Sequence, residues 1–202
     1  LGHFSEPLFT FERALAPFFG FPAYGTHITG FLWDKHLQKP SKIWVAKRSA
    51  SKKVEPSKLD QLVGGGLSYG MTPLKNVIKE AYEEAKIPAH LLKELSSPPK
   101  IIRYMIEERG EIRQDLLFNY QLPLPNDFNP TPLDGEVEHF MLLPPSEVIN
   151  QLETPERFKP NSGLVMIQFL LHHQLIPKEY PNFQAIKEGI ESHSTPSSPI
   201  SQ

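Results

Sequence analysis

Three glutamates lie close together in a segment that has the periodicity of an amphipathic helix. Glu80, Glu83 and Glu84 fall within residues 73–86, where apolar residues recur at helical spacing. At about 100° per residue, the three glutamates share one flank of that helix. The stripe expected to face the core consists of Leu74, Val77, Ile78, Ala81 and Ala85. The sequence therefore predicts an acidic edge beside a buried apolar stripe.

This acidic edge carries an electrostatic cost. Glu80 is three residues from Glu83 and four from Glu84, so each like-charge pair destabilises the helix by about 0.2–0.5 kcal/mol. The helix dipole adds to the cost, because anions are disfavoured in the second half of a helix. Lys79 could relieve only part of it through Glu83. A solvated helix face is the alternative explanation, but a bound Mg²⁺ would turn the repulsion into attraction, since it prefers carboxylate oxygens.

Glycines precede this helix. Gly64, Gly65, Gly66 and Gly70 form a flexible turn through which a substrate could approach the backbone. Thr72 and Pro73 then provide a hydroxyl cap and a proline at the first helical position. We therefore expect a glycine turn, a helix start and the three carboxylates at one site.

Residues 65–87 resemble the Nudix box, G-x5-E-x7-R-E-U-x-E-E-x-G-U, in which U is aliphatic. The spacing is kept, and the three glutamates match the glutamates that bind Mg²⁺ or Mn²⁺ in Nudix hydrolases. Met71 replaces the first Glu of the pattern, Lys79 replaces its Arg and Lys86 replaces its last Gly. Met71 and Lys79 replace two residues that pair with each other in the family, so no buried charge is left unpaired.

The segments around the box resemble one Nudix branch, the branch related to thiamin pyrophosphokinase. The matching segments are residues 24–30, 46–49, 58–66, 134–140 and 158–161, and the resemblance covers roughly residues 10–180. It implies a Nudix fold and metal-dependent hydrolysis of thiamin diphosphate, and of its damaged oxo and oxy forms, to the monophosphate. Such an enzyme would repair a metabolite pool. The alternatives are hydrolysis of another nucleoside or sugar diphosphate and a non-catalytic Nudix-fold binding module.

Further residues complete the predicted site. Glu136 is expected to join the metal ligands and to accept the proton of the attacking water, with Glu138 as second choice. The predicted substrate-binding residues are Arg48, Lys58, Gly65, Gly66, Tyr69 and His27. Each has a plain structural alternative, such as an exposed strand-edge carboxylate for Glu136 or a core histidine for His27.

The elements expected to position these residues belong to an α+β domain. Strands are predicted at 27–33, 42–47, 100–108, 114–122 and 136–143, and helices at 12–18, 73–86, 145–152, 163–174 and 182–191. The expected fold is a mixed β-sheet packed between helices. We expect an N-terminal extension at residues 1–23 that packs on the body, a Nudix domain at 24–178, a C-terminal helix at 179–191 and a disordered tail at 192–202.

Composition excludes several classes of protein. The 202 residues include 21 Lys and Arg and 23 Asp and Glu, so the net charge of −2 argues against binding nucleic acid by bulk charge. Cysteine is absent, which excludes disulfides and a thiolate metal site. The longest apolar run near the C-terminus, residues 164–171, is too short to span a membrane, and the sequence shows no secretory signal. We expect a cytoplasmic protein with a small-molecule diphosphate substrate and no nucleic-acid or membrane partner; the sequence leaves the oligomeric state open.

Overall fold

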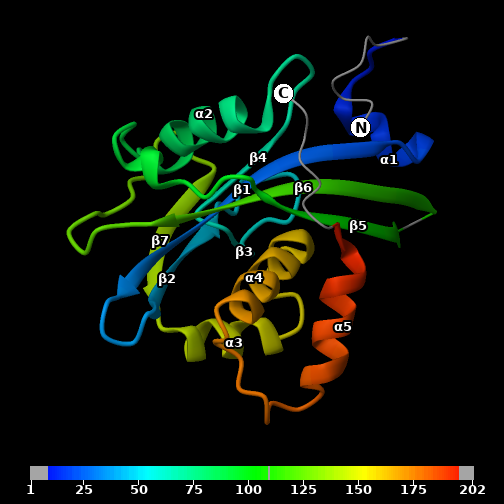
Figure 1. Cartoon of the computed structure of the whole chain (residues 1–202). Coiled ribbons are helices and arrows are strands. Elements are labelled where there is room, and N and C mark those ends of the chain that lie inside the picture. Colours follow the sequence, from blue (N-terminus) through cyan, green and yellow to red (C-terminus); the bar gives the residue numbers. More distant parts are fainter. Residues whose placement is uncertain (1–8, 109, 196–202) are drawn as a thin grey trace.

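A mixed eight-stranded sheet forms the centre of the computed structural model, which describes residues 9–108 and 110–195 (Figure 1). The strands run in the order β3-β2-β1-β6-β5-β8, with β4 paired to β1 and β7 paired to β2. Their bounds are β1 Pro22–Asp34, β2 Lys39–Arg48, β3 Leu59–Asp60, β4 Val63–Gly66, β5 Lys100–Glu108, β6 Glu111–Pro123, β7 Val137–Leu143 and β8 Ser194–Thr195. The predicted α+β class and mixed sheet are confirmed.

Strand β1 organises the sheet because it pairs with three neighbours. It runs parallel to β6 along one edge, from Pro22 opposite Gln114 to Phe31 opposite Pro123. Its other edge pairs antiparallel with β4 in its first half and with β2 in its second half. Its residues from 25 to 32 are buried without interruption, as expected for a strand covered on both faces.

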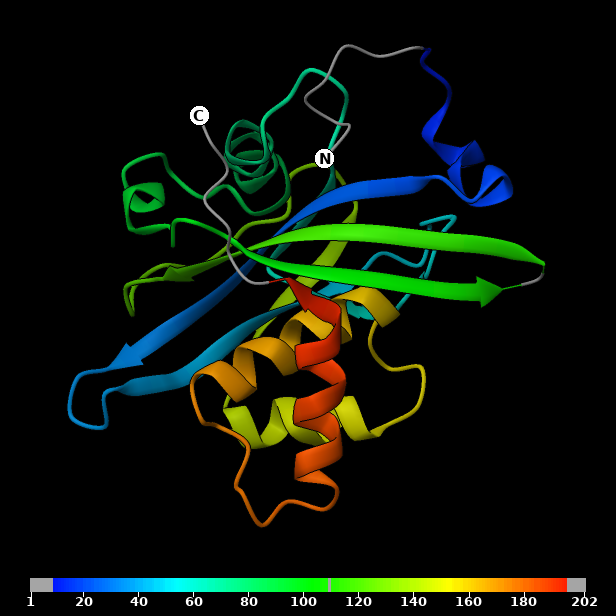
Figure 2. The same cartoon turned by 45° about the vertical axis from the view of Figure 1, so that its right-hand side comes forward.

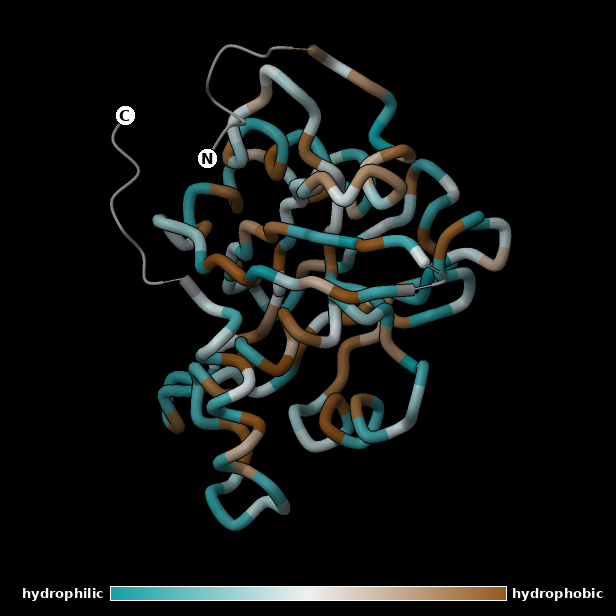
Figure 3. The backbone as a smooth tube through the Cα atoms, turned by 90° about the vertical axis from the view of Figure 1, so that its right-hand side faces the viewer, coloured by the Kyte–Doolittle hydropathy of each residue, from teal (hydrophilic) through white to brown (hydrophobic). Residues whose placement is uncertain are grey.

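Helices cover both faces of the sheet (Figures 1 and 2). Helix α2, Pro73–Ala85, lies on one face with the 3₁₀ turn η3, Leu91–Glu94. The opposite face carries three helices: α3 Pro145–Glu153, α4 Pro160–His172 and α5 Phe183–His193. Hydrophobic and hydrophilic residues alternate along the chain in Figure 3. Val77 of α2 belongs to the same core cluster as Ile28 of β1, whereas Val148 of α3 and Phe169 of α4 share a second cluster with Ile43 of β2.

The N-terminal segment forms a short helical turn. The 3₁₀ turn η2, Arg13–Leu15, leads into α1, Ala16–Phe19, which contacts β6. Gly20 ends the turn with a φ of 67°, a conformation that favours glycine, and the Gln114 side chain donates a hydrogen bond to its carbonyl at 3.1 Å.

Several predicted boundaries were wrong. Gly64, Gly65 and Gly66 were predicted as a flexible turn, but they form strand β4 and pair with β1. The two-residue strands β3 and β8 were not predicted either, and α4 begins at Pro160 rather than at residue 163. The predicted tail begins too early, because α5 continues to His193 and β8 follows it; residues 196–202 lie outside the described residues.

Helix α2 begins as predicted, but its buried face is rotated from the predicted stripe. The Thr72 hydroxyl accepts a hydrogen bond from the Lys75 backbone N–H at 3.2 Å. Leu74 and Ile78 are exposed, whereas Asn76 and Glu84 are buried. The Asn76 amide donates to the Thr26 hydroxyl on β1 at 2.8 Å. Polar contacts with the strands therefore turn one acidic residue inward.

Candidate active site

Glu84 is the buried member of the three α2 glutamates. Its side chain accepts a hydrogen bond from the backbone N–H of Gly64 at 2.8 Å. Burial raises the pKa of Glu84 to about 8, and the nearby carboxylates of Asp60, Glu80 and Glu136 act in the same direction. In the part of the chain that the structure describes, no Lys, Arg or His forms an ion pair with Glu84. The site thus holds a carboxylate whose charged form lacks a cation.

Glu80 and Glu83 share one ammonium group. The Lys79 Nζ lies 2.7 Å from Glu83 Oε2 and 3.3 Å from Glu80 Oε1, so the predicted Lys79–Glu83 pair is present. Burial is the main cause that raises the pKa of Glu80. Lys79 replaces the arginine of the Nudix pattern and offsets part of the acidic charge.

A cavity of about 940 Å³ lies beside these carboxylates. It runs along β4, which is an edge strand because it pairs only with β1 in the described part of the sheet. Eight of the ten predicted site residues line it: His27, Arg48, Gly65, Gly66, Glu80, Glu83, Glu84 and Glu136. Lys58 and Tyr69 are not among its lining residues. The chain therefore brings most of the predicted site to a single hollow.

The two candidates for a proton-accepting carboxylate differ in position. Glu136 lines the cavity and forms an ion pair with Lys52 at 2.6 Å. Glu138 is not a lining residue, and its exposed side chain lies 3.5 Å from His139. Geometry therefore favours Glu136.

Arg48 lines the cavity, but its guanidinium donors are already used. They donate to Asp60 at 2.8 Å and to the backbone carbonyls of Glu55 and Val54 at 2.9 Å each. Lys58, also predicted to bind phosphate, instead pairs with Glu55 at 2.6 Å. Both cations hold the loop after β2 in place.

Asp60 is a buried anion that was not among the predicted site residues. Besides Arg48, it binds Lys159 at 3.3 Å and accepts hydrogen bonds from the Ser162 hydroxyl and the Gln61 N–H. Burial alone would raise the pKa of Asp60, but Lys159, His27 and Arg48 lower it well below its usual range. Lys159 and Ser162 sit at the start of α4, so this cluster joins α4 to the sheet.

His27 is a buried wall residue. Its side chain is 2% exposed, and burial, followed by the charge of Lys159, lowers its pKa to about 4. The imidazole is therefore neutral at physiological pH. Its Nδ1 has no hydrogen-bond partner within the described residues.

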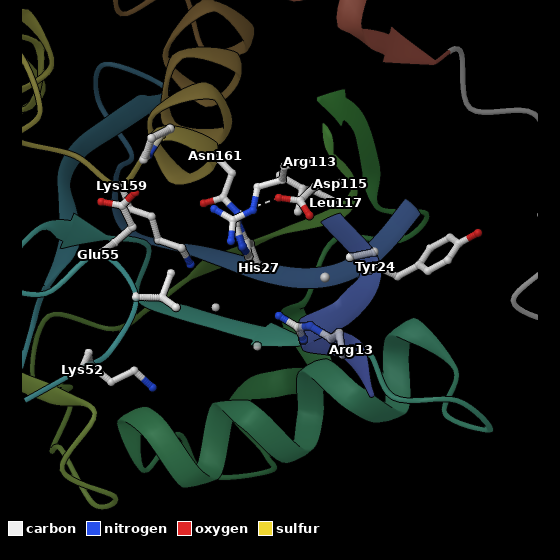
Figure 4. A pocket seen from close by; sticks show the side chains of 18 of the residues that line it. Arg13, Tyr24, His27, Lys52, Glu55, Arg113, Asp115, Leu117, Lys159 and Asn161 are labelled. Carbon is white, nitrogen blue, oxygen red and sulfur yellow. Dashed lines mark hydrogen bonds between the residues drawn. The ribbon is translucent and has the colours of Figure 1, made fainter. Parts of the chain in front are cut away.

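Several polar residues that line the cavity were not predicted, and four of them lie on the N-terminal turn, β6 and α4. Figure 4 shows Arg113, Asp115 and Asn161 on the side of β1 away from α2, and Arg13 near β4. Asn161 donates to Asp115 at 3.4 Å. Asn161 lies in a segment that matched the Nudix branch, which was the available signal; nothing in the sequence indicated that β6 and the N-terminal turn face the same cavity.

The acidic residues suit a divalent cation by donor type. Carboxylate oxygens are the ligands that Mg²⁺ and Mn²⁺ favour, and Glu84 is a buried carboxylate without a positive partner. In the present side-chain positions, however, no three His, Asp or Glu residues within 9–108 and 110–195 converge closely enough to hold a metal. Because Lys79 contacts both Glu80 and Glu83, its displacement would free those oxygens.

Comparison with known proteins shows the family of this chain. Residues 24–164 match the NUDIX domain family, which is more than half of the chain. The chain belongs to the Nudix family. It is 40% identical over 181 residues to "Nudix hydrolase 24, chloroplastic" and 39% identical over 177 residues to "Nudix hydrolase 20, chloroplastic", both of Arabidopsis thaliana. These matches cover 89% and 87% of this chain but only 48% and 46% of the plant proteins, so the Nudix chain spans about half their length.

A solved structure supports the fold of this Nudix chain. A Nudix hydrolase of M. smegmatis superposes with a TM-score of 0.52 at 13% identity, covering 77% of this chain and 87% of that chain. At this identity the likeness concerns the fold alone.

None of the helices within residues 9–108 and 110–195 has the length and apolar character of a membrane span.

Proposed function

We propose that this Nudix chain is a metal-dependent pyrophosphohydrolase that cleaves thiamin diphosphate and its oxo and oxy forms to the monophosphate and phosphate. The observation that carries the proposal is the 940 Å³ cavity lined by Glu80, Glu83, Glu84 and Glu136. Membership of the Nudix family supports hydrolysis of a diphosphate. The resemblance of the flanking segments to one branch supports thiamin diphosphate as the substrate.

Glu80, Glu83, Glu84 and Glu136 would hold Mg²⁺ or Mn²⁺. When bound, the cation supplies charge neutralisation for the diphosphate and makes water a better nucleophile. The buried Glu84 is a strong candidate ligand, because a cation there would offset the repulsion from Asp60, Glu80 and Glu136.

Residues of the chain accept the proton of the attacking water and hold the walls of the cavity in position. A water oxygen forms a bond to phosphorus, the bond from phosphorus to the bridging oxygen breaks, and the water proton passes to the Glu136 carboxylate. The pairing of Glu136 with Lys52 holds this acceptor at the cavity wall. The buried cluster around Asp60 fixes the start of α4 and the loop after β2, which border the cavity.

Other lining residues of the cavity suit an aromatic, cationic organic group. Phe21 and Tyr104 supply rings, and Asp115 supplies a carboxylate. Aromatic faces and a carboxylate are groups that attract a heteroaromatic cation.

Cytoplasmic location remains a prediction from the sequence, and the two plant relatives are named chloroplastic.

The test is phosphate release from thiamin, oxothiamin and oxythiamin diphosphates, measured side by side with Mg²⁺ and with EDTA. ADP and a sugar diphosphate serve as competing substrate classes. Glu84→Gln provides the matched inactive control. Turnover only on the other diphosphates would move the assignment to them, and no metal-dependent turnover on any diphosphate would favour a binding module.

A further inference from the structure

We propose that Arg13, in the N-terminal turn ahead of the Nudix domain, binds the diphosphate group of the substrate from the side of the cavity opposite Glu80. This inference rests on the proposed function for the reaction, but it concerns a residue outside the segment that matches the family, residues 24–164. The ligand chemistry is a diphosphate, whether free or attached to an organic group.

The first observation is the way Arg13 sits over Gly66. A Cβ added to Gly66 would lie 1.1 Å from Arg13 Nη1 and 2.3 Å from its Cζ. The guanidinium thus occupies space that exists only because residue 66 has no side chain. The neighbouring Gly65 has the same relation to Glu80, whose Cδ would lie 2.4 Å from an added Cβ.

Arg13 and Glu80 therefore pack against two successive glycines of edge strand β4, the cation at Gly66 and the anion at Gly65. Successive Cα atoms are about 3.8 Å apart, and successive side-chain positions face opposite sides of a strand. Gly65 and Gly66 nevertheless line the same cavity. A diphosphate bound along this edge would therefore meet the carboxylate side at Gly65 and the guanidinium at Gly66.

The second observation is that the guanidinium is available. Across residues 9–108 and 110–195, Arg13 forms no hydrogen bond through its side chain and no ion pair. Its charge lowers the pKa of Asp115 only as a minor contribution, against burial of that carboxylate, which raises it. Arg48, Lys52, Lys79 and Lys159 in the same cavity are paired. Lys53 and Arg113 also line the cavity without an ion pair among the described residues, but Arg13 is the cation that packs over Gly66 of β4.

The third observation is that the turn carrying Arg13 is fixed to the domain. Ala16 is 3% exposed, the Phe21 N–H donates to the Ala16 carbonyl at 2.9 Å, and Gln114 holds the Gly20 carbonyl. The rings of Phe11, Phe19 and Phe21 contact one another. Arg13 is therefore presented from an anchored element, which lowers the entropic cost of binding an anion.

The test measures binding without turnover. Isothermal titration of the holo-protein with methylenediphosphonate in Mg²⁺ reports the diphosphate site directly, because the P–C–P bridge is not hydrolysed. Arg13→Ala is expected to weaken binding about tenfold or more, as for loss of charge-assisted hydrogen bonds. Arg13→Lys is expected to retain part of the affinity, and Glu12→Ala, on the same turn but outside the cavity lining, is expected to bind like wild type.

Gly66→Ala provides an independent test, because its added methyl group would push the flexible end of Arg13 aside. This variant should bind methylenediphosphonate as weakly as Arg13→Ala does. The double variant should bind no more weakly than either single variant. Unchanged binding by Arg13→Ala, or single effects that multiply in the double variant, would overturn the inference.

Turnover on thiamin diphosphate separates this inference from the proposed function. If the wild-type protein hydrolyses thiamin diphosphate and Arg13→Ala changes neither binding nor turnover, the proposed function stands and the role of Arg13 is rejected. If the wild-type protein is inactive but its binding of methylenediphosphonate depends on Arg13, the proposed function is rejected and the anion site stands. In an active enzyme, Arg13→Ala should raise KM more than it lowers kcat, a split that a purely structural role would not produce.

Discussion

The backbone N–H of Gly64 donates a hydrogen bond to the buried carboxylate of Glu84 at 2.8 Å, which links edge strand β4 to helix α2. This one donor is the only hydrogen bond that Glu84 receives within the described chain. It cannot offset the loss of water around a buried charge. The consequence is a site that is electrostatically incomplete until a positive group arrives.

Stability without metal should fall as pH rises through the range in which Glu84 ionises. Its pKa is raised from 4.5 to about 8 in the folded protein. A raised pKa gives stability that is fully present below the unfolded value and is lost as pH approaches the folded value. Thermal unfolding in EDTA should therefore show wild type losing stability relative to Glu84→Gln between about pH 4.5 and 8. Mg²⁺ should reduce that loss, and parallel pH profiles for the two proteins would contradict the prediction.

Gly65→Ala should damage the reaction by displacing Glu80. An added Cβ would lie 2.4 Å from the Glu80 Cδ and 2.8 Å from its Oε2, so the carboxylate must move. We expect kcat to fall at least about tenfold, equivalent to about 1.4 kcal/mol of transition-state stabilisation. Steady-state kinetics at saturating Mg²⁺ measures this. Gly189→Ala in α5, where nothing lies within 4 Å, is the control and should leave kcat unchanged.

Lys86→Gly should stabilise the protein. Lys86 ends α2 with a φ of 52°, a left-handed conformation that costs a residue with a Cβ about 1 kcal/mol or more. The expected rise in Tm is roughly 2–4 °C for a chain of this size. Differential scanning calorimetry would show it. Lys75→Gly, inside the same helix, should instead lower stability by about 1 kcal/mol, and equal effects of the two variants would contradict this account.

Asp60→Asn should be strongly destabilising. It removes the anion between Arg48 and Lys159, leaving two largely buried cations without their partner. Breaking such a buried pair costs about 3–5 kcal/mol. Urea unfolding measures the change. Lys52→Ala breaks the more exposed pair with Glu136 and should cost less than about 1 kcal/mol, so similar losses in both variants would count against a special role for Asp60.

Local signals in the sequence were sufficient to predict α2 and most of the sheet. Thr72 and Pro73 marked the start of α2, and alternating residues marked β1, β2 and β7. The short β4 was missed because glycines carry no alternation, and the buried face of α2 was misplaced because Asn76 bonds to Thr26 on a distant strand.

The grouping of candidate site residues was predictable where it depends on spacing along one element. Glu80, Glu83 and Glu84 lie within two turns of α2, and all three line the cavity. Arg48 and Lys58 were predicted to bind the substrate because a cation can pair with a phosphate oxygen. Their partners, Asp60 and Glu55, became visible only in the folded chain. Arg13 reaches the cavity through contacts between the N-terminal turn and β6, which no local pattern encodes.

The bonds from Ser162 to Asp60 and from Gln61 to the Ser162 carbonyl join positions about one hundred residues apart along the chain. During synthesis, Asp60 leaves the ribosome long before the start of α4 exists. The nascent protein therefore holds this carboxylate without Lys159 and Ser162, two of the partners that later enclose it. A fragment that stops before residue 159 should lack this cluster and the part of the cavity wall that Lys159, Pro160 and Asn161 form, whichever metal is present in the cell.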